Sequence, residues 1–356
     1  MKKCAGYIVM MLLSTVYLVS SSSELTNRIV EENTGPDPVI SSDKYRYGDL
    51  FSLSYLSQFQ IKPAPPLKIA LPECKTEPNT NLYIICDSYI ESYLADKKYY
   101  CGVDSLFKAL IYDLRPLEVS INHNKKNVLL LEIAERNLRP AFYRTDHINN
   151  LIAIKGPNQS TEGIHSDGAS LFSSLKNFLF NSLINTNLEL NTWEYSIFTP
   201  IKEFKADLNY KLFNVVDNNV AISPDKKYLF YKPTIDSTAI TSSFNNVPDT
   251  EIHSITGKLN FIYSNAKNIG FDEMYLSIIP NPVSVLSPDY NGMRYNRLLS
   301  RVQDSPELKM PFIDMYAAYK NANISVYQRS DSHWSMDGAY MWLEKFNEKL
   351  VKLHAQ

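Results

Sequence analysis

The sequence predicts an α/β fold with a mainly parallel sheet. An apolar run of strand length, Asn81–Cys86, is followed by the helix-compatible stretch "SYIESYLADKK" and by a second apolar run, Asn127–Ile133. Later in the chain, apolar residues at helical spacing between Gly257 and Gly270 lead into a third run, Met274–Ile279. Strands that alternate with helices favour β-α-β units, whose strands pair in parallel.

The ends of the later elements carry recognisable signals. Gly270 follows the helical pattern at the position where a helix often stops in the left-handed conformation. Pro280 ends the strand that comes next. Near the C-terminus, one face of a final predicted helix carries Trp342, Phe346, Leu350 and Leu353. These elements belong to a folded part expected at residues 45–356.

The chain is large enough for a substantial core. It has 356 residues, of which 44% are hydrophobic, which suits one large domain or two modest ones. The formal net charge is -2 and there is no long Lys/Arg block, which argues against nucleic acid as a partner. No Cys or His spacing is typical of zinc ligands, so we expect neither a metal nor a diffusible cofactor.

The first 44 residues differ from the rest. Lys2 and Lys3 precede the apolar run Tyr7–Ser20, the pattern of an export signal peptide or of an uncleaved membrane anchor over residues 1–22. Residues 23–44 are polar and are expected to form a linker. We therefore expect an exported protein of the periplasm or cell envelope.

A long loop is expected in the middle of the folded part. Residues 144–170 are rich in Asn, Gly, Ser and Asp and show no periodicity. They are predicted to join two segments, 45–143 and 171–356, of one domain. Among the cysteines, Cys74 and Cys101 are the expected disulfide pair, since Cys86 lies in an apolar run and is expected to be buried.

The first candidate for chemistry is the Asp87-Ser88 pair, which follows the first predicted strand directly. Ligands of open α/β sheets bind beyond the carboxyl ends of the strands. A serine that also starts a helix lies beside backbone N–H groups that favour a developing oxyanion. The alternative is a serine that only caps the helix.

The second candidate is Asp331-x-His333 in "QRSDSHWSMDGAYMW". A histidine accepts the proton of a serine hydroxyl near neutral pH, and an aspartate holds its other ring nitrogen. A spacing of two places both side chains on one side of an extended segment. The alternative is an ordinary polar turn.

Together, the two motifs resemble those of the SGNH (GDSL-type) hydrolase superfamily. "CDS" is similar to its first motif, with Cys86 in place of glycine, and "DSHW" is similar to its last motif. The closer resemblance is to the AlgX/AlgJ-like polysaccharide O-acetyltransferase branch, through "KYRYGDLFSLSYLSQF", "LLLEIAERNLRP" and "YLSIIPNPVSVLSPDYNGMRYNRLL". In that branch the D-x-H segment comes first, so this chain looks circularly permuted, with the new joint in 144–170.

The resemblance implies a flavodoxin-like three-layer α/β/α sandwich with a mainly parallel sheet, and a triad of Ser88, His333 and Asp331. The Ser88 N–H is the expected first oxyanion donor. Further candidates have smaller roles: Asn281 as a second oxyanion donor or a turn residue, Trp334 as packing beside the histidine or a sugar platform, Asp87 as a residue that orients the turn, and Glu135-Arg136 as a structural ion pair.

These features predict an exported serine acyl-transfer enzyme that O-acetylates an envelope or extracellular polysaccharide through an acetyl-serine intermediate. The acceptor would be a polysaccharide or oligosaccharide, and the resemblance implies a membrane-bound O-acyltransferase as the acetyl donor. One alternative keeps the triad but uses water, as a carbohydrate esterase or deacetylase. Another is a non-catalytic polysaccharide-binding or assembly protein on the same fold.

Overall fold

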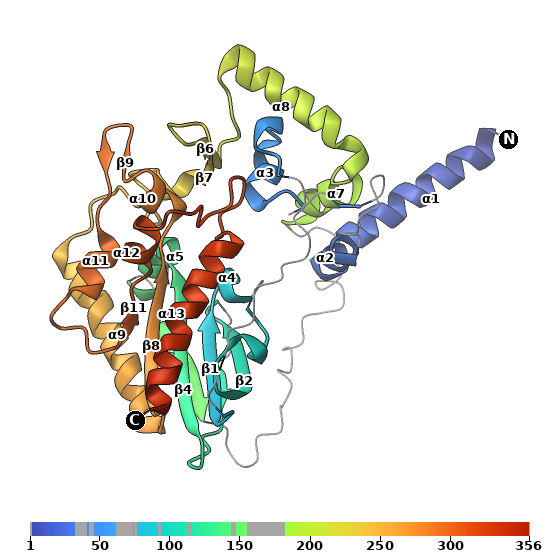
Figure 1. The fold of residues 1–356 in the computed structure, drawn as a ribbon. Coiled ribbons are helices and arrows are strands. Elements are labelled where there is room, and N and C mark those ends of the chain that lie inside the picture. Colours follow the sequence, from blue (N-terminus) through green and yellow to red (C-terminus); the bar gives the residue numbers. More distant parts are fainter. Residues whose placement is uncertain are drawn as a thin grey trace. The chain divides into compact units, whose positions relative to one another are not determined.

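The computed structural model describes residues 2–32, 41–42, 46–61, 74, 77–91, 94–112, 116–143, 147–154 and 182–355. The chain divides into two compact units (Figure 1). The helical unit comprises Met1–Pro63 and Gln159–Asp217, and the sheet unit comprises Ala64–Asn158 and Asn218–Gln356. Within the range 45–356 that was expected to form one domain, residues 159–217 group with the helical unit and the rest from 64 onward groups with the sheet unit.

The sheet unit is built on a five-stranded sheet of order β11-β8-β4-β1-β2, in which all neighbouring strands are parallel. Its strands are β1 (Thr80–Cys86), β2 (Val103–Leu110), β4 (Lys126–Ala134), β8 (Glu273–Ile279) and β11 (Phe312–Ile313). Every residue of β1 is buried, and so is nearly every residue of β4. Burial on both faces explains why these strands read as continuous apolar runs.

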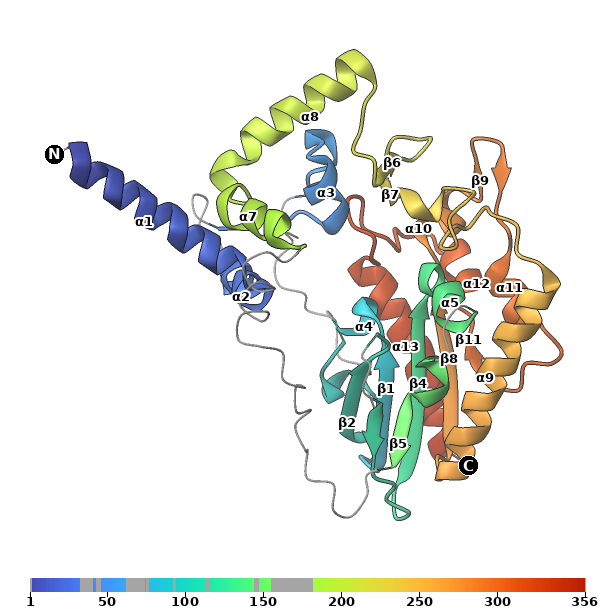
Figure 2. The same cartoon turned by 180° about the vertical axis from the view of Figure 1, so that it is seen from behind.

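Helices cover both faces of this sheet, which confirms the predicted α/β three-layer architecture (Figures 1 and 2). On one face Leu82 and Ile84 of β1 pack with α13 (Met336–His354). On the other face Tyr83 and Ile85 pack in a cluster with α9 (Asp249–Ile269) and α5 (Glu135–Phe142). The alternation of side chains along β1 thus separates the two cores.

The boundaries of the two long helices follow their capping residues. Helix α9 ends at Gly270, whose φ of 113° is left-handed, as predicted. Helix α13 begins after Ser335, whose hydroxyl accepts a hydrogen bond from the backbone N–H of Gly338. The apolar face of α13, Trp342, Phe346, Leu350 and Leu353, is buried as expected.

Two local expectations for the sheet unit were wrong. The helix after β1 is short, since α4 spans only Ser88–Glu91 in the described residues. Part of the expected loop at 144–170 forms a strand, β5 (Ile152–Ile154), which pairs with β3 (Leu117–Val119). Residues 144–146 and 155–170 of that expected loop lie outside the described residues.

Several short elements complete the sheet unit. They are the antiparallel pairs β6 (Val220–Ile222) with β7 (Leu229–Tyr231) and β9 (Asp289–Tyr290) with β10 (Met293–Arg294), the helices α10 (Pro282–Leu286), α11 (Leu298–Gln303) and α12 (Met315–Lys320), and the 3-10 helices Lys97–Tyr99, His147–Asn150 and Lys232–Thr234. The predicted Cys74–Cys101 disulfide is confirmed, and Cys86 is a buried free thiol.

The helical unit contains α1 (Lys2–Ser20), α2 (Ser23–Glu32), α3 (Asp49–Ser54), α7 (Ile184–Thr192), α8 (Thr199–Phe213) and the 3-10 helices Ser57–Phe59 and Ser196–Phe198. The expected linker at 23–44 is therefore helical over its first ten residues. Its helix α2 packs on α7. Asn191 Nδ2 of α7 donates hydrogen bonds to Thr26 Oγ1 of α2 (3.0 Å) and to Ser20 Oγ at the end of α1 (2.9 Å).

Within the described ranges, no single helix is both long and apolar enough to cross a bilayer. The pair Gly6–Ser20 and Ser23–Val30 meets the criterion jointly but is bent by 99°.

Candidate functional site

Ser88 lies at the carboxyl end of β1, at the first position of α4. It is half-buried, and its backbone N–H has no acceptor within the helix because it precedes the first intrahelical donor. Cys86, which stands where the resembled family has glycine, belongs to β1 and has an ordinary negative φ. Its side chain packs in the core beneath α13, so this chain needs no glycine at that position.

Asp87 holds the turn that presents Ser88, as predicted. Its carboxylate accepts hydrogen bonds from the backbone N–H groups of Tyr89 (3.0 Å) and Ala134 (2.7 Å) and from Asn137 Nδ2 (3.3 Å). Its own N–H donates to Glu132 Oε2 (3.0 Å). The turn after β1 is thereby tied to the end of β4 and to the first turn of α5.

The structure brings Ser88, His333 and Asp331 together in one hydrogen-bonded chain. Ser88 Oγ lies 2.8 Å from His333 Nε2, across a sequence separation of 245 residues. His333 Nδ1 lies 2.6 Å from Asp331 Oδ1. Because a carboxylate only accepts, Nδ1 carries the proton in the neutral ring and Nε2 accepts from the serine hydroxyl. This is the arrangement of a serine nucleophile with its base and an orienting acid.

The orientation of Asp331 is itself fixed by the backbone. Its Oδ1 accepts a second hydrogen bond, from the His333 backbone N–H (2.9 Å). The surrounding loop is closed by backbone hydrogen bonds from Gln328 to His333 (3.3 Å) and from Ser335 to Val326 (2.9 Å). Both catalytic candidates of this loop are therefore held by its own main chain.

Tyr89 connects the two halves of the site, a role that the sequence analysis missed. It is fully buried, and its hydroxyl donates to the Ser332 carbonyl at 2.6 Å. Its ring packs against His333 with the centroids 4.8 Å apart and meets Trp334 edge to face at 5.1 Å. The residue after Ser88 thus positions the loop that carries His333.

Trp334 supports the site from within the core. It is only 1% exposed, and its ring packs on Tyr89 and on Trp342. Trp334 thus contributes packing next to the His333 loop, and its burial leaves no free ring face on which a sugar could stack.

Asn281 is a structural residue, and its expected role as an oxyanion donor is not supported. It is 1% exposed; its backbone N–H donates to Glu135 Oε2 (2.8 Å) and its Nδ2 donates to Ser243 Oγ (2.9 Å). The side-chain amide is therefore used inside the protein, where it joins the end of β8 to the loop around Ser243.

The expected ion pair between Glu135 and Arg136 is also absent from the described residues. Glu135 Oε2 instead accepts hydrogen bonds from the Asn281 N–H (2.8 Å) and Ser284 Oγ (2.7 Å), and burial raises its pKa to about 7. The Arg136 guanidinium lies over the Tyr89 ring, 5.6 Å from the centroid. Adjacent residues at the start of α5 point in different directions, which separates the two charges.

Glu132 is a second buried carboxyl group, beneath the turn that carries Ser88. Glu132 is fully buried on β4. Burial is the main reason that the pKa of its carboxyl group lies well above the usual range, and the nearby charge on Asp87 is the second reason. Glu132 Oε2 accepts the Asp87 N–H at 3.0 Å, so this carboxyl group supports the turn from below.

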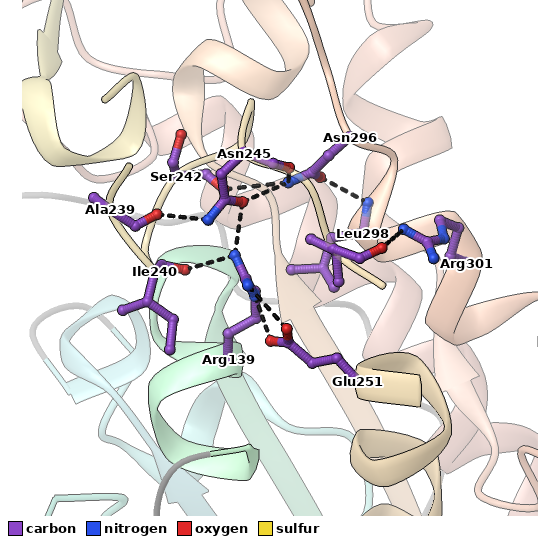
Figure 3. Close-up of polar contacts among 10 residues, drawn as sticks. Arg139, Ala239, Ile240, Ser242, Asn245, Glu251, Asn296, Leu298 and Arg301 are labelled. Carbon is purple, nitrogen blue, oxygen red and sulfur yellow. Dashed lines mark hydrogen bonds and ion pairs between the residues drawn. The ribbon is translucent and has the colours of Figure 1, made fainter. Parts of the chain in front are cut away.

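A buried network fixes the other end of α5 (Figure 3). Arg139 forms a bidentate ion pair with Glu251 of α9, and its Nη1 donates to Asn245 Oδ1 at 2.6 Å. Asn296 Nδ2 in turn donates to the carbonyls of Ser242 and Asn245. Because α5 also carries Asn137, this network anchors a helix whose first turn contacts the site.

The arrangement is suited to covalent acyl transfer, since it places a hydroxyl nucleophile, an oriented base and a backbone donor at one sheet edge. Comparison of the chain with protein-family models, with curated proteins and with solved structures gives no match.

Proposed function

We propose that the protein is a serine acyl-transfer enzyme that moves an acetyl group through an acetyl-serine intermediate. The observation that carries the proposal is the continuous relay from Ser88 Oγ to His333 (2.8 Å) and from His333 to Asp331 (2.6 Å). A serine hydroxyl becomes a useful nucleophile only when such a base removes its proton.

The steps follow from this geometry. Ser88 Oγ forms a bond to the ester carbonyl carbon while its proton passes to His333 Nε2, and the Asp331 carboxylate stabilises the charged ring. The Ser88 N–H donates to the oxyanion of the tetrahedral intermediate. The leaving alcohol takes the proton from Nε2 as the carbon–oxygen bond of the donor breaks. An acceptor hydroxyl then loses its proton to Nε2, attacks the acetyl group and releases Ser88 with its proton restored.

A polysaccharide hydroxyl is the proposed acceptor, in an exported protein of the cell envelope or periplasm. The support is the apolar run at residues 7–20 and the resemblance to the polysaccharide O-acetyltransferase branch. The resemblance also supports a membrane-bound O-acyltransferase as the acetyl donor. Water is the alternative acceptor, because the half-buried Ser88 is partly exposed to solvent. With water as the acceptor, the protein would be an acetylesterase.

The intact relay weighs against a purely non-catalytic binding protein. Such a protein has no need for a histidine held by both a carboxylate and a serine hydroxyl. The ordinary strand geometry of Cys86 removes the reason to regard its presence as a sign of lost catalysis.

An acetyl-ester assay with and without oligosaccharide acceptors tests the proposal. Ser88→Ala and His333→Ala are expected to lower both hydrolysis and transfer by about 10³-fold or more, since members of such a triad act as a unit. Ser264→Ala and His253→Ala, both exposed positions on α9, are the matched controls and should behave as wild type. Equal activity in wild type and Ser88→Ala would refute the relay. The products formed by the wild type distinguish the two reactions, because transfer gives an acetylated oligosaccharide and hydrolysis gives free acetate.

A further inference from the structure

Helix α8 turns its apolar side away from the unit that holds it. Phe204 is 70% exposed and Ile201 is 64% exposed. The same face continues along the helix at spacings of three and four, so that it forms one stripe, called here the α8 stripe: Ile201, Phe204, Leu208 and Leu212. A surface helix ordinarily buries such a face and exposes its polar one. Contiguous exposed apolar surface of this kind marks an interaction site.

Polar contacts on the inner side of α8 fix this orientation. Lys202 Nζ donates to Glu194 Oε1 (2.7 Å) and to the Tyr55 hydroxyl (3.0 Å). One turn further along, Asp207 accepts a hydrogen bond from Ser57 Oγ (2.6 Å). All of these residues belong to the helical unit. Rotation of the stripe inward would break them, so the outward apolar face is part of the folded unit.

Lysines border the stripe on both sides. At 100° per residue, Lys205 and Lys211 lie on opposite margins of the stripe, and both are exposed. Lys211 Nζ also lies 3.7 Å from Asp207 Oδ2, and the Lys211 side chain is 69% exposed. None of the exposed residues of α8 is acidic. A second copy docked on the stripe would place lysines against lysines, whereas anionic lipid headgroups would pair with them.

The same unit carries a second exposed apolar surface. Residues Tyr7–Leu13 of α1 expose a run of large apolar side chains, and α1 is joined to α7 by the Asn187 hydrogen bond to the Ser20 carbonyl (2.8 Å). Interfacial helices combine large apolar side chains with lysines at the margins of the apolar face. We propose that the helical unit binds an anionic lipid surface through the α8 stripe, independently of the chemistry at Ser88.

A tryptophan placed in the stripe tests this proposal. Phe204→Trp in the full chain is compared with Phe261→Trp, the same substitution at an exposed phenylalanine of α9 in the sheet unit (50% exposed). Each protein is reconstituted with vesicles of phosphatidylglycerol and phosphatidylcholine, with or without bromine on the acyl chains. After subtraction of the wild-type signal, bromine should quench the tryptophan at position 204 and leave that at position 261 unchanged.

Lys205→Gln and Lys211→Gln, added to the Phe204→Trp chain, are expected to weaken contact with anionic vesicles about fivefold each and to leave neutral vesicles unaffected. Absence of quenching at position 204, or equal quenching at both positions, would overturn the proposal. It would also be overturned if the tryptophan at position 204 were shielded from acrylamide without vesicles, since another part of the protein or a second copy would then cover the stripe.

Discussion

The substitution Gly338→Ala is expected to disturb both stability and the candidate site, because the glycine sits where no side chain fits. A Cβ at this position would lie 2.2 Å from the Val326 carbonyl oxygen and 3.1 Å from Trp334 Cβ. A carbon and a carbonyl oxygen are in ordinary contact at about 3.3 Å, so the start of α13 must move by about 1 Å. The carbonyl cannot simply rotate, since it accepts the Ser335 N–H at 2.9 Å.

The magnitude follows from two opposing terms. Overpacking of this severity costs about 3 kcal/mol, and the better helix propensity of alanine returns about 1 kcal/mol. The net loss of about 2 kcal/mol lowers the unfolding midpoint by roughly 4–8 °C for a unit of the size of the sheet unit, in which Gly338 lies. Since Val326 and Trp334 flank Asp331 and His333, a shift of about 1 Å should also lower kcat by about 10²-fold.

Thermal unfolding by circular dichroism and acetyl-ester hydrolysis measure the two effects. The control is Gly257→Ala on α9, where nothing lies within 4 Å of the added Cβ. This change should raise stability by about 0.5–1 kcal/mol through helix propensity alone. If Gly338→Ala were as stable and as active as Gly257→Ala, the steric argument would be refuted.

Three further changes have distinct signatures. Asp331→Asn should lower kcat by about 10⁴-fold with little change in KM, measured in the same ester assay, because an amide does not stabilise the charged ring; a wild-type rate would exclude the relay. Burial raises the pKa of Glu135 from 4.5 to about 7, so the folded protein holds this proton more tightly and loses stability as the pH rises through that range. Glu135→Gln has no proton to lose over this range. In urea titrations, the unfolding free energy of the variant relative to wild type should therefore rise by about 3 kcal/mol between pH 4.5 and about 7. A difference that stays constant with pH would contradict the raised pKa of Glu135. Cys101→Ser opens a disulfide with a sequence separation of 27 and should cost about 3–4 kcal/mol of unfolding free energy by loop entropy, whereas Cys4→Ser should cost nothing.

The local elements were readable from the sequence because their signals are local. Continuous apolar runs predicted β1, β4 and β8, and the spacing of apolar residues with Gly270 predicted the end of α9. The Cys74–Cys101 pair followed from the apolar surroundings of Cys86. Each inference needs only periodicity, capping or burial along a short stretch.

The partners of the polar residues were not readable, because a buried polar group accepts whichever donor the fold brings to it. The pairing of Ser88 with His333 rested on a resemblance, and only the fold places their side chains 2.8 Å apart. At the start of α5, the sequence predicted an ion pair between the neighbours Glu135 and Arg136. In the structure, the Glu135 carboxyl group instead accepts a hydrogen bond from the backbone N–H of Asn281, at the end of another strand. Tyr89, one position after Ser88, carries no sequence signal for its hydrogen bond to Ser332.

The sequence by itself thus determined the strands β1, β4 and β8, the helices α9 and α13, the disulfide and the residue types of a serine relay. The tertiary structure decided that Trp334 and Asn281 are buried supports, that the chain leaves the sheet unit between 158 and 218, and that α8 presents its apolar face outward. The physical reason is the range of the interactions. Periodicity and capping act over a few residues, whereas the choice of a hydrogen-bond partner or a packing face depends on contacts that close loops of a hundred residues or more.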